Sequence, residues 1–355
     1  MLRHLQRFAA AGHRISVIGE WGQSSSAGWT VHHLPHRRFW WPPFGAKDGA
    51  LRSIRMRLWA GECDRLLGAP PEAVLTYLSY HSELLSEVAA HYARRRRLPL
   101  TTIVHDDVAA FRKGDAEETR TLGRRYRWIM AQAQQNWFVS PELAQAYGFG
   151  GGADSVLLPI PEGAAHRVEW REDFSHKPLV IYAGFIHEPQ LPLLARLGRI
   201  IDHAGGHLML LARESPALRD LCAMNPITLK GLLPSNREAL DFVAAHGAAF
   251  LAAYCERIED MPWIRSSFPS KVVEFSHVGL PLLFVAPAGS AIHRWNAERQ
   301  IAGNFAPDQE AGIAEFIVAL KDPKSWDRLA RQMRGLAASD FDPAQIHQRL
   351  TGKLA

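Results

Sequence analysis

Phe268-Pro-Ser-Lys-Val-Val-Glu-Phe-Ser-His-Val-Gly-Leu-Pro-Leu-Leu283 is the stretch that decides the fold. Pro269 and Ser270 predict a helix start, because proline suits the first helical positions and a serine hydroxyl can accept a hydrogen bond from the free amides there. Gly279 is placed for a left-handed C-terminal cap. The apolar run 280–286 that follows is typical of a buried parallel strand. The stretch therefore predicts a short helix and then a strand, as in an α/β protein.

Lys271 and Glu274 are the charged residues of this otherwise apolar stretch. The free amides and the dipole of a helix N-terminus attract an anion, and a neighbouring ammonium adds to that attraction. A carboxylate one turn later can accept hydrogen bonds from the two hydroxyls of a ribose. Phosphate and ribose together indicate a nucleotide. The alternative is that the two residues are only a spaced charge pair on a helix.

The Pro-Ser-Lys run and the residues after it resemble the donor-nucleotide signature of the retaining GT-B glycosyltransferases, the family-4-like "glycosyl transferases group 1". The resemblance implies that Glu274 is the second glutamate of this signature, which holds the donor ribose, and that Phe268 occupies its aromatic position. The first glutamate, eight residues earlier in the family, is replaced here by Ser266. Two acidic residues just upstream could take over part of its role, Glu259 and Asp260.

The length and composition predict two domains, because 355 residues with 47% hydrophobic content can bury two cores. We place the first at residues 1–165 and the second at 175–338. The resemblance implies that a C-terminal helix within 341–355 packs back on the first domain.

The cysteines and the hydropathy bear on the compartment. The three cysteines lie far apart without a C-x-x-C pair, which indicates a reducing compartment and no structural zinc. No apolar run reaches the roughly 18 residues of a membrane span, and no secretory leader is recognisable. We expect a cytoplasmic protein, either free or associated with the cytosolic face of a membrane.

The net charge of +5 is concentrated in the N-terminal half, where residues 1–160 hold 20 Lys and Arg against 14 Asp and Glu. A basic surface suits lipid headgroups, a polyprenyl diphosphate or nucleic acid, and it is equally compatible with solvation alone. The segment 37–44 joins arginines to tryptophans and predicts either contact with lipid or acceptor or a loop folded against its domain. No known nucleic-acid module is present. Three histidines precede this segment without the spacing of a metal site, His32, His33 and His36.

The N-terminal residues predict a helix over 2–9, a stop at Gly12 and a strand over 14–19. This order resembles the first helix and the second strand of the same family. The family's first strand and glycine loop have no counterpart ahead of this helix. We expect that strand to be absent or to lie upstream of Met1, and we favour the second alternative.

His105 and Asp106 follow the predicted strand 98–104. In an open parallel sheet the carboxyl ends of the strands face the ligand crevice. The resemblance places a histidine here, close to the donor sugar and the acceptor, so His105 and Asp106 are our candidate catalytic residues. The alternative is a loop histidine with a structural aspartate partner.

Gly184 ends the predicted first strand of the second domain, and the arginine and lysine with which the family clamps the diphosphate are missing after it. Arg213, after the predicted strand 207–212, and Lys271 could supply the phosphate charge instead. The alternative for Arg213 is a surface ion pair with Glu214. The segment around Gly231 resembles the part of the family that borders the base.

We therefore predict two Rossmann-like α/β domains facing across a cleft. The predicted function is transfer of a sugar from a nucleotide-sugar donor, which is a substrate rather than a cofactor, to a saccharide or polyprenyl-linked acceptor. The resemblance implies retention, and we expect no metal. A GT-B epimerase and a non-catalytic nucleotide-binding protein are the rival functions. The predicted donor-binding residues are Gly184, Arg213, Gly231, Phe268, Ser270, Lys271 and Glu274.

Overall fold

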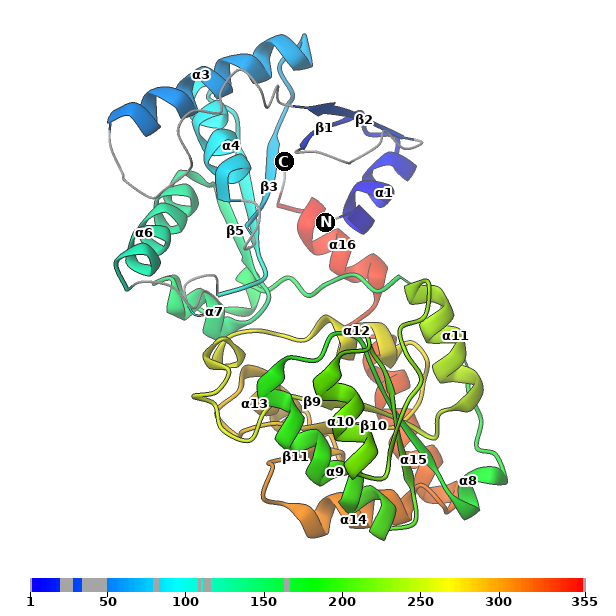
Figure 1. Ribbon diagram of the computed structural model, residues 1–355. Helices are drawn as coiled ribbons and strands as arrows, with labels where there is room; N and C mark the ends of the chain where they lie inside the picture. The colour runs from blue at the N-terminus through cyan, green and yellow to red at the C-terminus, as the bar shows by residue number, and fades with distance from the viewer. Residues whose placement is uncertain are drawn as a thin grey trace. The chain divides into compact units, whose positions relative to one another are not determined.

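The computed structural model describes residues 2–19, 28–33, 50–78, 83–107, 110, 116–162 and 167–353. The chain divides into two compact units, one of Met1–Leu157 with His347–Ala355 and one of Leu158–Ile346 (Figure 1). The second unit thus begins at residue 158, whereas the sequence analysis predicted that the first domain ends at residue 165 and the second begins at residue 175. The chain returns to the first unit within its last helix, at residue 347 rather than 341.

The first unit contains two parallel sheets. A two-stranded sheet joins β1 (Ile15–Gly19) to β2 (Trp29–His33), and a three-stranded sheet has the order β3 (Val74–Leu78), β4 (Leu100–Val104), β5 (Gln135–Phe138). Within the described residues no strand precedes α1. The helices are α1 (Leu2–Ala10), α3 (Ala50–Leu67), α4 (Glu83–Arg96), α6 (Ala116–Gln132), α7 (Pro141–Ala146), the 3-10 turn η1 (Ala153–Ser155) and, in its last residues, α16 (Pro343–Thr351).

The core between α3 and α4 ties these two sheets together. Met56 and Trp59 of α3 and Tyr92 of α4 are buried there. Ile18 from β1 and Val74 from β3 both pack against this cluster. The two sheets therefore share one helical layer, although in the described part of the chain no hydrogen-bonded ladder joins β1 to β3.

The second unit is built on one parallel sheet in the order β11-β10-β9-β6-β7-β8. Its strands are β6 (Leu179–Ala183), β7 (His207–Leu211), β8 (Ile227–Leu229), β9 (Ala249–Ala253), β10 (Leu282–Val285) and β11 (Asn304–Phe305). Its helices are α8 (Asp173–His176), η2 (Glu188–Gln190), α9 (Leu191–His203), α10 (Pro216–Met224), α11 (Asn236–His246), η3 (Pro262–Arg265), α12 (Ser270–Ser276), α13 (Ala291–Glu298), α14 (Glu310–Ala319) and α15 (Pro323–Ala337).

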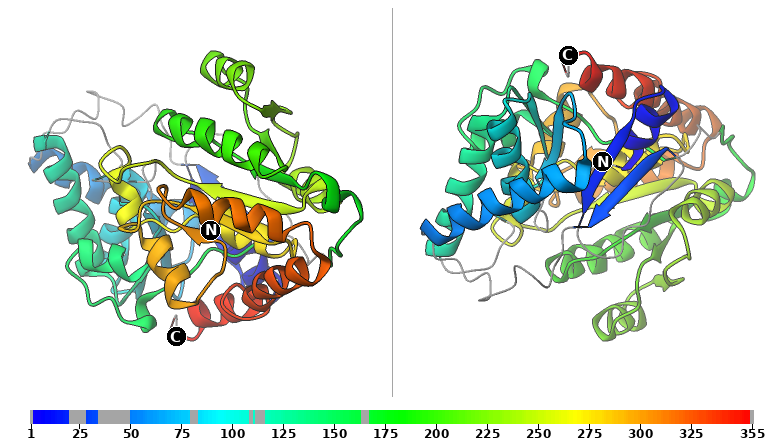
Figure 2. Two further views of the ribbon diagram at one scale, coloured as in Figure 1. Left: turned by 90° about the horizontal axis from the view of Figure 1, so that it is seen from below. Right: turned by 90° about the horizontal axis from the view of Figure 1, so that it is seen from above.

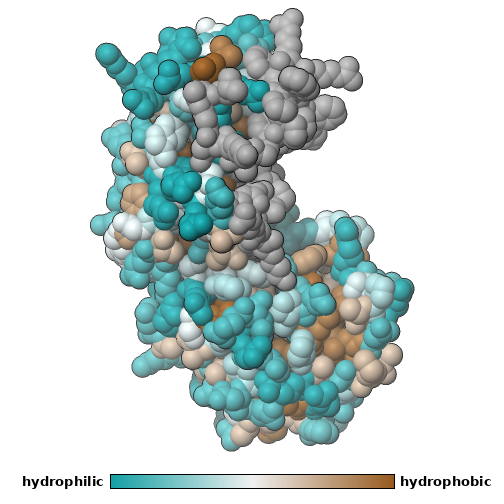
Figure 3. Space-filling view, turned by 60° about the vertical axis from the view of Figure 1, so that its left-hand side comes forward, coloured by the Kyte–Doolittle hydropathy of each residue, from teal (hydrophilic) through white to brown (hydrophobic). Residues whose placement is uncertain are grey.

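Helices cover both faces of this sheet, as in a doubly wound α/β fold. The helices α9, α10 and α14 pack together, and α12 packs with α15. Figure 2 shows the green α9 on one side of the strands and the orange-red α15 on the other. On the face seen in Figure 3 the described surface is mainly hydrophilic, with apolar side chains in scattered patches.

The strand order reverses between β6 and β9. From β6 the chain moves outward through β7 and β8, and it then returns to the other side of β6 to lay down β9, β10 and β11. The loops after β6 and β9 therefore leave the sheet in opposite directions. Such a switch point opens a crevice at the carboxyl ends of the strands, and ligands bind there in open α/β sheets.

The helix predicted from the deciding stretch is α12, and it ends as predicted. His277 is its C-terminal cap, and Gly279 adopts a φ of +76°, in the left-handed region. The predicted role of Ser270 as a cap is wrong: Pro269 occupies the cap position with extended backbone, and Ser270 is already the first helical residue. The helix is held by its apolar side, where Phe275 stacks on Phe250 of β9 with ring centroids 4.0 Å apart.

Candidate functional site

Gly184 and Lys271 meet at the switch point of the second unit. Gly184 directly follows β6, has a φ of +119° and donates its N–H to the Leu211 carbonyl at 2.9 Å. A Cβ atom on this residue would lie 2.6 Å from Cε of Lys271. The glycine therefore allows the backbone conformation and also makes room for the lysine side chain. The structure brings together two residues that the sequence assigned separately to the donor.

The Lys271 ammonium is held by oxygens that carry no formal charge. Nζ donates to the Tyr182 hydroxyl at 2.6 Å and to the Phe185 carbonyl at 3.0 Å, and it lies 4.2 Å from the centre of the Tyr182 ring. Among the described residues no carboxylate forms an ion pair with it. Burial lowers the pKa of Lys271 to about 7. A cation in these surroundings is suited to bind an anion.

Tyr182 and Gln190 position this lysine, and the sequence analysis missed both. The Tyr182 hydroxyl donates to the Phe185 carbonyl at 2.7 Å. The buried Gln190 amide donates to the Ala253 carbonyl at 2.6 Å and to the Tyr182 hydroxyl at 3.3 Å. Its Oε1 accepts the His187 N–H at 2.7 Å. One side chain therefore links the loop after β6 to the end of β9, across the switch point.

Aromatic rings surround the outer side of this loop. Phe185 is 65% exposed. The His187 ring stands edge-on to the Phe185 ring at 4.7 Å and to the Trp263 ring at 5.5 Å. Burial, and then the charge of Lys271, lower the pKa of His187, so the imidazole is neutral near pH 7. The wall beside Lys271 is therefore aromatic and uncharged.

Arg213 and Gly231 lie at the same edge of the sheet, after β7 and β8. The Arg213 side chain is exposed. Its expected alternative partner, Glu214, instead forms an ion pair with Arg219 at 3.2 Å. Gly231 has a φ of +92° and nothing within 4 Å of the position of a Cβ atom, so backbone conformation rather than crowding favours glycine there.

Glu274 is half-buried one turn after Lys271, and it holds the segment that enters the second unit. Its Oε2 accepts the backbone N–H of Glu162 at 2.8 Å. The Glu162 carboxylate in turn accepts from the Asn236 amide at 2.5 Å. A carboxylate has about four lone-pair positions, and the Glu162 N–H occupies one of those of Glu274.

Phe268 and Ser270 do not add side chains to the environment of Lys271. Phe268 is 7% exposed and packs edge-on against Trp295 at 5.2 Å and Phe341 at 6.2 Å. Ser270 is exposed on the first turn of α12. The structure thus places Phe268 in an aromatic core cluster, which accounts for an aromatic residue at that position by packing.

The residues considered in place of the first glutamate are occupied elsewhere. Ser266 is buried, and its hydroxyl donates to the Trp263 carbonyl at 3.4 Å. Glu259 forms an ion pair with Arg265 at 3.2 Å, and Asp260 forms one with Arg257 at 3.1 Å. Of the acidic residues predicted to contact the donor, Glu259 and Asp260 are therefore tied to arginines, whereas Glu274 is bound to a backbone N–H.

The first unit places His105 and Asp106 at the end of β4, beside the end of β3. The His105 ring lies 5.0 Å from the ring of Tyr77. Burial lowers the pKa of His105 to about 3 and raises the pKa of Asp106. The imidazole is therefore neutral at pH 7 and can exchange hydrogen bonds with a hydroxyl. Tyr77 was not predicted, although a tyrosine near the end of an apolar strand was a usable signal.

A second pair of imidazoles links the two helices at the ends of the chain. His4 of α1 is 4% exposed, and its Nδ1 lies 3.2 Å from Nδ1 of His347 on α16. Phe8 stands edge-on to His347 at 4.7 Å. Burial lowers the pKa of His4 to about 3. This pair fixes α16 to α1 within the first unit.

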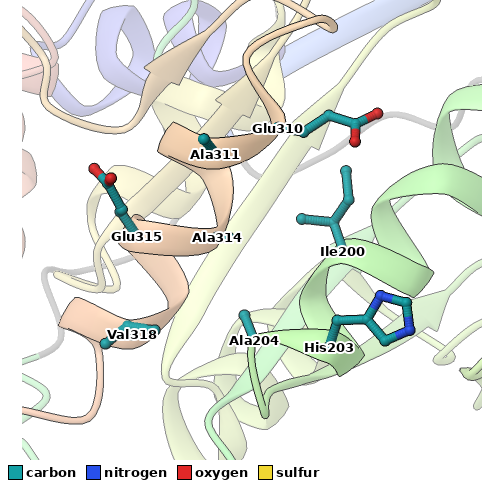
Figure 4. Close-up of a pocket in the computed structure, with 8 residues that line it drawn as sticks. All are labelled: Ile200, His203, Ala204, Glu310, Ala311, Ala314, Glu315 and Val318. Atoms are coloured by element: carbon teal, nitrogen blue, oxygen red, sulfur yellow. The ribbon is translucent and has the colours of Figure 1, made fainter.

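A groove of about 530 Å³ lies between α9 and α14 (Figure 4). Its lining includes Ile200, Ala314 and Val318 together with two carboxylates, Glu310 and Glu315. None of the predicted site residues lines it. It lies toward the end of α9 that is remote from the Gln190 contacts.

Three expectations concern metals, membranes and the basic loop. Among the described residues no three His, Cys, Asp or Glu side chains gather as a metal site requires. In the same part of the chain no helix is both long and apolar enough to cross a bilayer. His36 and the segment 37–44 lie outside the described residues.

No family model matches the sequence, and no curated protein is similar to it in sequence. Solved structures are similar in fold. The trehalose-6-phosphate synthase of E. coli bound with UDP-2-fluoroglucose has a TM-score of 0.62 at 10% identity, over 99% of this chain and 94% of its own. A glycosyltransferase from Rickettsia africae has a TM-score of 0.63 at 10% identity, over 99% and 92%. Anabaena HepE with UDP and glucose has a TM-score of 0.57 at 13% identity, over 92% and 86%.

This is the GT-B fold. Its two Rossmann-like domains confirm the fold predicted from the sequence. The two units described above correspond to such domains, and the switch point of the second places Lys271 where ligands of open α/β sheets bind.

Proposed function

We propose that the protein is a glycosyltransferase that transfers a sugar from a nucleotide-sugar donor. The observation that supports this most strongly is the Lys271 ammonium, held at the switch point by the Tyr182 hydroxyl and the Phe185 carbonyl. Proteins of this fold have been crystallised with UDP and with a UDP-sugar analogue. A diphosphate is the anion that such a site suits best.

In this proposal the departing diphosphate is stabilised by cations of the second unit. Lys271 binds the phosphate oxygens on which negative charge develops, and Arg213 at the end of β7 adds a second cation. Glu274 accepts hydrogen bonds from the ribose. These groups would replace the divalent ion that other enzymes use, so the reaction needs no metal. Retention is proposed on the sequence resemblance alone.

The first unit contributes the groups that meet the sugar and the acceptor. A neutral His105 accepts a hydrogen bond from a sugar hydroxyl or donates one to it, and Asp106 beside it can accept a proton. Asp106 is suited to this task because burial raises its pKa, which makes its carboxylate a stronger base. The proposed acceptor is a saccharide or a polyprenyl-linked saccharide, in the synthesis of a cell-surface glycan.

A lipid-linked acceptor would bring the protein to a membrane, and α3 has the surface for it. Ile54 and Leu58 are 51% and 55% exposed, one turn apart, and Arg57 is exposed between them. Apolar side chains beside arginines suit an anionic bilayer. We expect wild type to sediment with vesicles that contain phosphatidylglycerol and Leu58→Asp to bind them more weakly. Equal binding of both proteins would exclude α3 as the contact.

A second candidate function is nucleotide binding without turnover. It is favoured by Ser266, whose buried hydroxyl bonds to a backbone carbonyl where the family has a sugar-contacting glutamate. The two functions share the donor site and differ only in whether sugar is transferred.

Thermal shift against UDP, GDP, ADP, dTDP and CMP tests the donor site, with wild type compared with Glu274→Ala. A ligand at 100 times its dissociation constant adds about 2.7 kcal/mol of stability. We expect one nucleotide to stabilise wild type and to stabilise the variant much less. Glu315→Ala, on the exposed side of α14 and beside the groove that is remote from Lys271, is the matched control and should respond as wild type does. No response of wild type to any nucleotide would contradict the proposal.

A further inference from the structure

Among the described residues, Tyr182 contacts the Lys271 ammonium and His187 lies close enough to feel its charge, and neither neutralises it. Tyr182 of β6 stays protonated, because burial raises the pKa of its hydroxyl. His187 of the loop after β6 is neutral near pH 7. Glu274 lies on the same helix and directs Oε2 to the Glu162 N–H. The free site therefore holds an ammonium with hydrogen-bond acceptors but without an ion pair in the described structure.

The position of this ammonium is fixed rather than adaptable. The side chain passes over Gly184, where a Cβ atom would come within 2.6 Å of Cε and 3.0 Å of Nζ. The Tyr182 hydroxyl and the Phe185 carbonyl hold Nζ by hydrogen bonds. A lysine confined in this way is partly shielded from water, and burial without a counter-charge favours its neutral form.

We propose that binding of a nucleoside diphosphate at this site takes up one proton onto Nζ of Lys271. The bound diphosphate supplies the counter-charge that the free site lacks. Lys271 is therefore protonated in the complex, whereas the free protein is a mixture of molecules with charged and with neutral Lys271. The inference rests on the proposed function and adds a regulation to it. The affinity for the donor therefore decreases as the pH rises above neutrality.

The size of the effect follows from the surroundings of Lys271. Its pKa of about 7 leaves about half of the free protein protonated at pH 7 and about a hundredth at pH 9. If the complex stays protonated throughout, affinity falls about 50-fold between these pH values. The terminal phosphate of UDP, with a pKa of about 6, is already ionised over this range. His187 is already neutral there, and Tyr182 is still protonated.

Isothermal titration calorimetry of the full chain with UDP tests the proposal. Titrations at pH 8 in two buffers with different ionisation enthalpies give the number of protons taken up, and we expect about 0.9. Titrations at pH 7 and pH 9 give the loss of affinity. Lys271→Arg is the decisive variant, because an arginine stays charged over this range. It should bind UDP without proton uptake and with nearly the same affinity at both pH values.

Gly184→Ala is a second variant, which displaces the ammonium without removing it. It should weaken UDP binding at pH 7 while the second unit still unfolds cooperatively. UDP binding by wild type without proton uptake, or a loss of affinity that persists in Lys271→Arg, would overturn the inference and leave the proposed function intact. Failure of UDP, GDP, ADP, dTDP and CMP to bind even at pH 6 would overturn both.

Discussion

Replacing Gln190 by alanine should both destabilise the second unit and weaken donor binding. The side chain is 2% exposed and forms three hydrogen bonds, with the Ala253 carbonyl, the Tyr182 hydroxyl and the His187 N–H. Two of these partners are backbone groups on opposite sides of the switch point. Alanine fills none of these roles and leaves buried polar groups without a partner.

The magnitude follows from those contacts. A hydrogen bond contributes about 1 kcal/mol net, and a buried polar group left without a partner costs about 1–3 kcal/mol. We therefore expect Gln190→Ala to lower the free energy of unfolding of the second unit by about 3 kcal/mol. For a domain of this size, 1 kcal/mol corresponds to a shift of about 2–4 °C in Tm. The expected decrease in Tm is about 6–12 °C.

Differential scanning calorimetry checks the stability, and titration with UDP at pH 7 checks the site. Gln348→Ala is the matched control, because Gln348 is exposed on α16 and the expected change is within about 0.5 kcal/mol. UDP affinity should fall in Gln190→Ala even below its Tm, because Tyr182 loses a partner and Lys271 is held less firmly. A variant as stable as wild type, or one that binds UDP equally well, would refute the role of Gln190 as the link across the switch point.

Three further predictions concern parts of the chain away from Lys271. Phe268→Leu should lower the free energy of unfolding by about 1–2 kcal/mol, measured by urea unfolding, because Phe268 packs against Trp295 and Phe341. The affinity for UDP should be unchanged, and a large loss of affinity would show a direct donor contact. The pKa of His4 is lowered to about 3, so its contribution to stability is present above about pH 6.5 and is lost at about 1.4 kcal/mol per pH unit as the pH falls toward 3. His4→Phe should make urea unfolding between pH 6 and pH 4.5 less pH-dependent, and an unchanged slope would argue against a buried neutral His4. Gly279→Ala should lower the free energy of unfolding by about 1 kcal/mol, measured by thermal unfolding, because its φ of +76° suits glycine. An unchanged Tm would show that α12 ends equally well without this glycine.

Local sequence was enough to predict the elements that depend on local chemistry. The helix α12 ends before Gly279, and the apolar run after it forms β10, because a left-handed cap and an apolar run are recognisable over a few residues. The predicted cap by Ser270 failed because proline took the cap position and shifted the serine into the helix.

The contacts that assemble the candidate site could not be predicted from local sequence patterns, because they join residues that are distant in sequence. Tyr182 and Gln190 lie in an apolar strand and at a helix start, and their roles depend on Lys271, 89 residues from Tyr182. Glu274 and Glu162 are 112 residues apart. The resemblance predicted that Lys271 and Gly184 serve one ligand, and only the three-dimensional structure showed that the glycine makes room for the lysine.

Phe268 shows how a motif can suggest a contact that packing explains equally well. Its position in the signature suggested the donor, whereas its ring contacts Trp295 and Phe341, which are distant in sequence. A single sequence cannot separate these two causes, because both require an aromatic side chain at the same position.

Release of nucleoside diphosphate from a panel of nucleotide-sugars, measured by coupled assay with and without a pool of saccharide acceptors, tests the central claim most directly. We predict that wild type releases the diphosphate from one class of donor, without added divalent metal, and faster with an acceptor. Lys271→Met should lose this activity while remaining folded. Release that persists in Lys271→Met, or no release from any donor by a wild-type protein that binds the nucleotide, would contradict the claim that this site transfers a sugar.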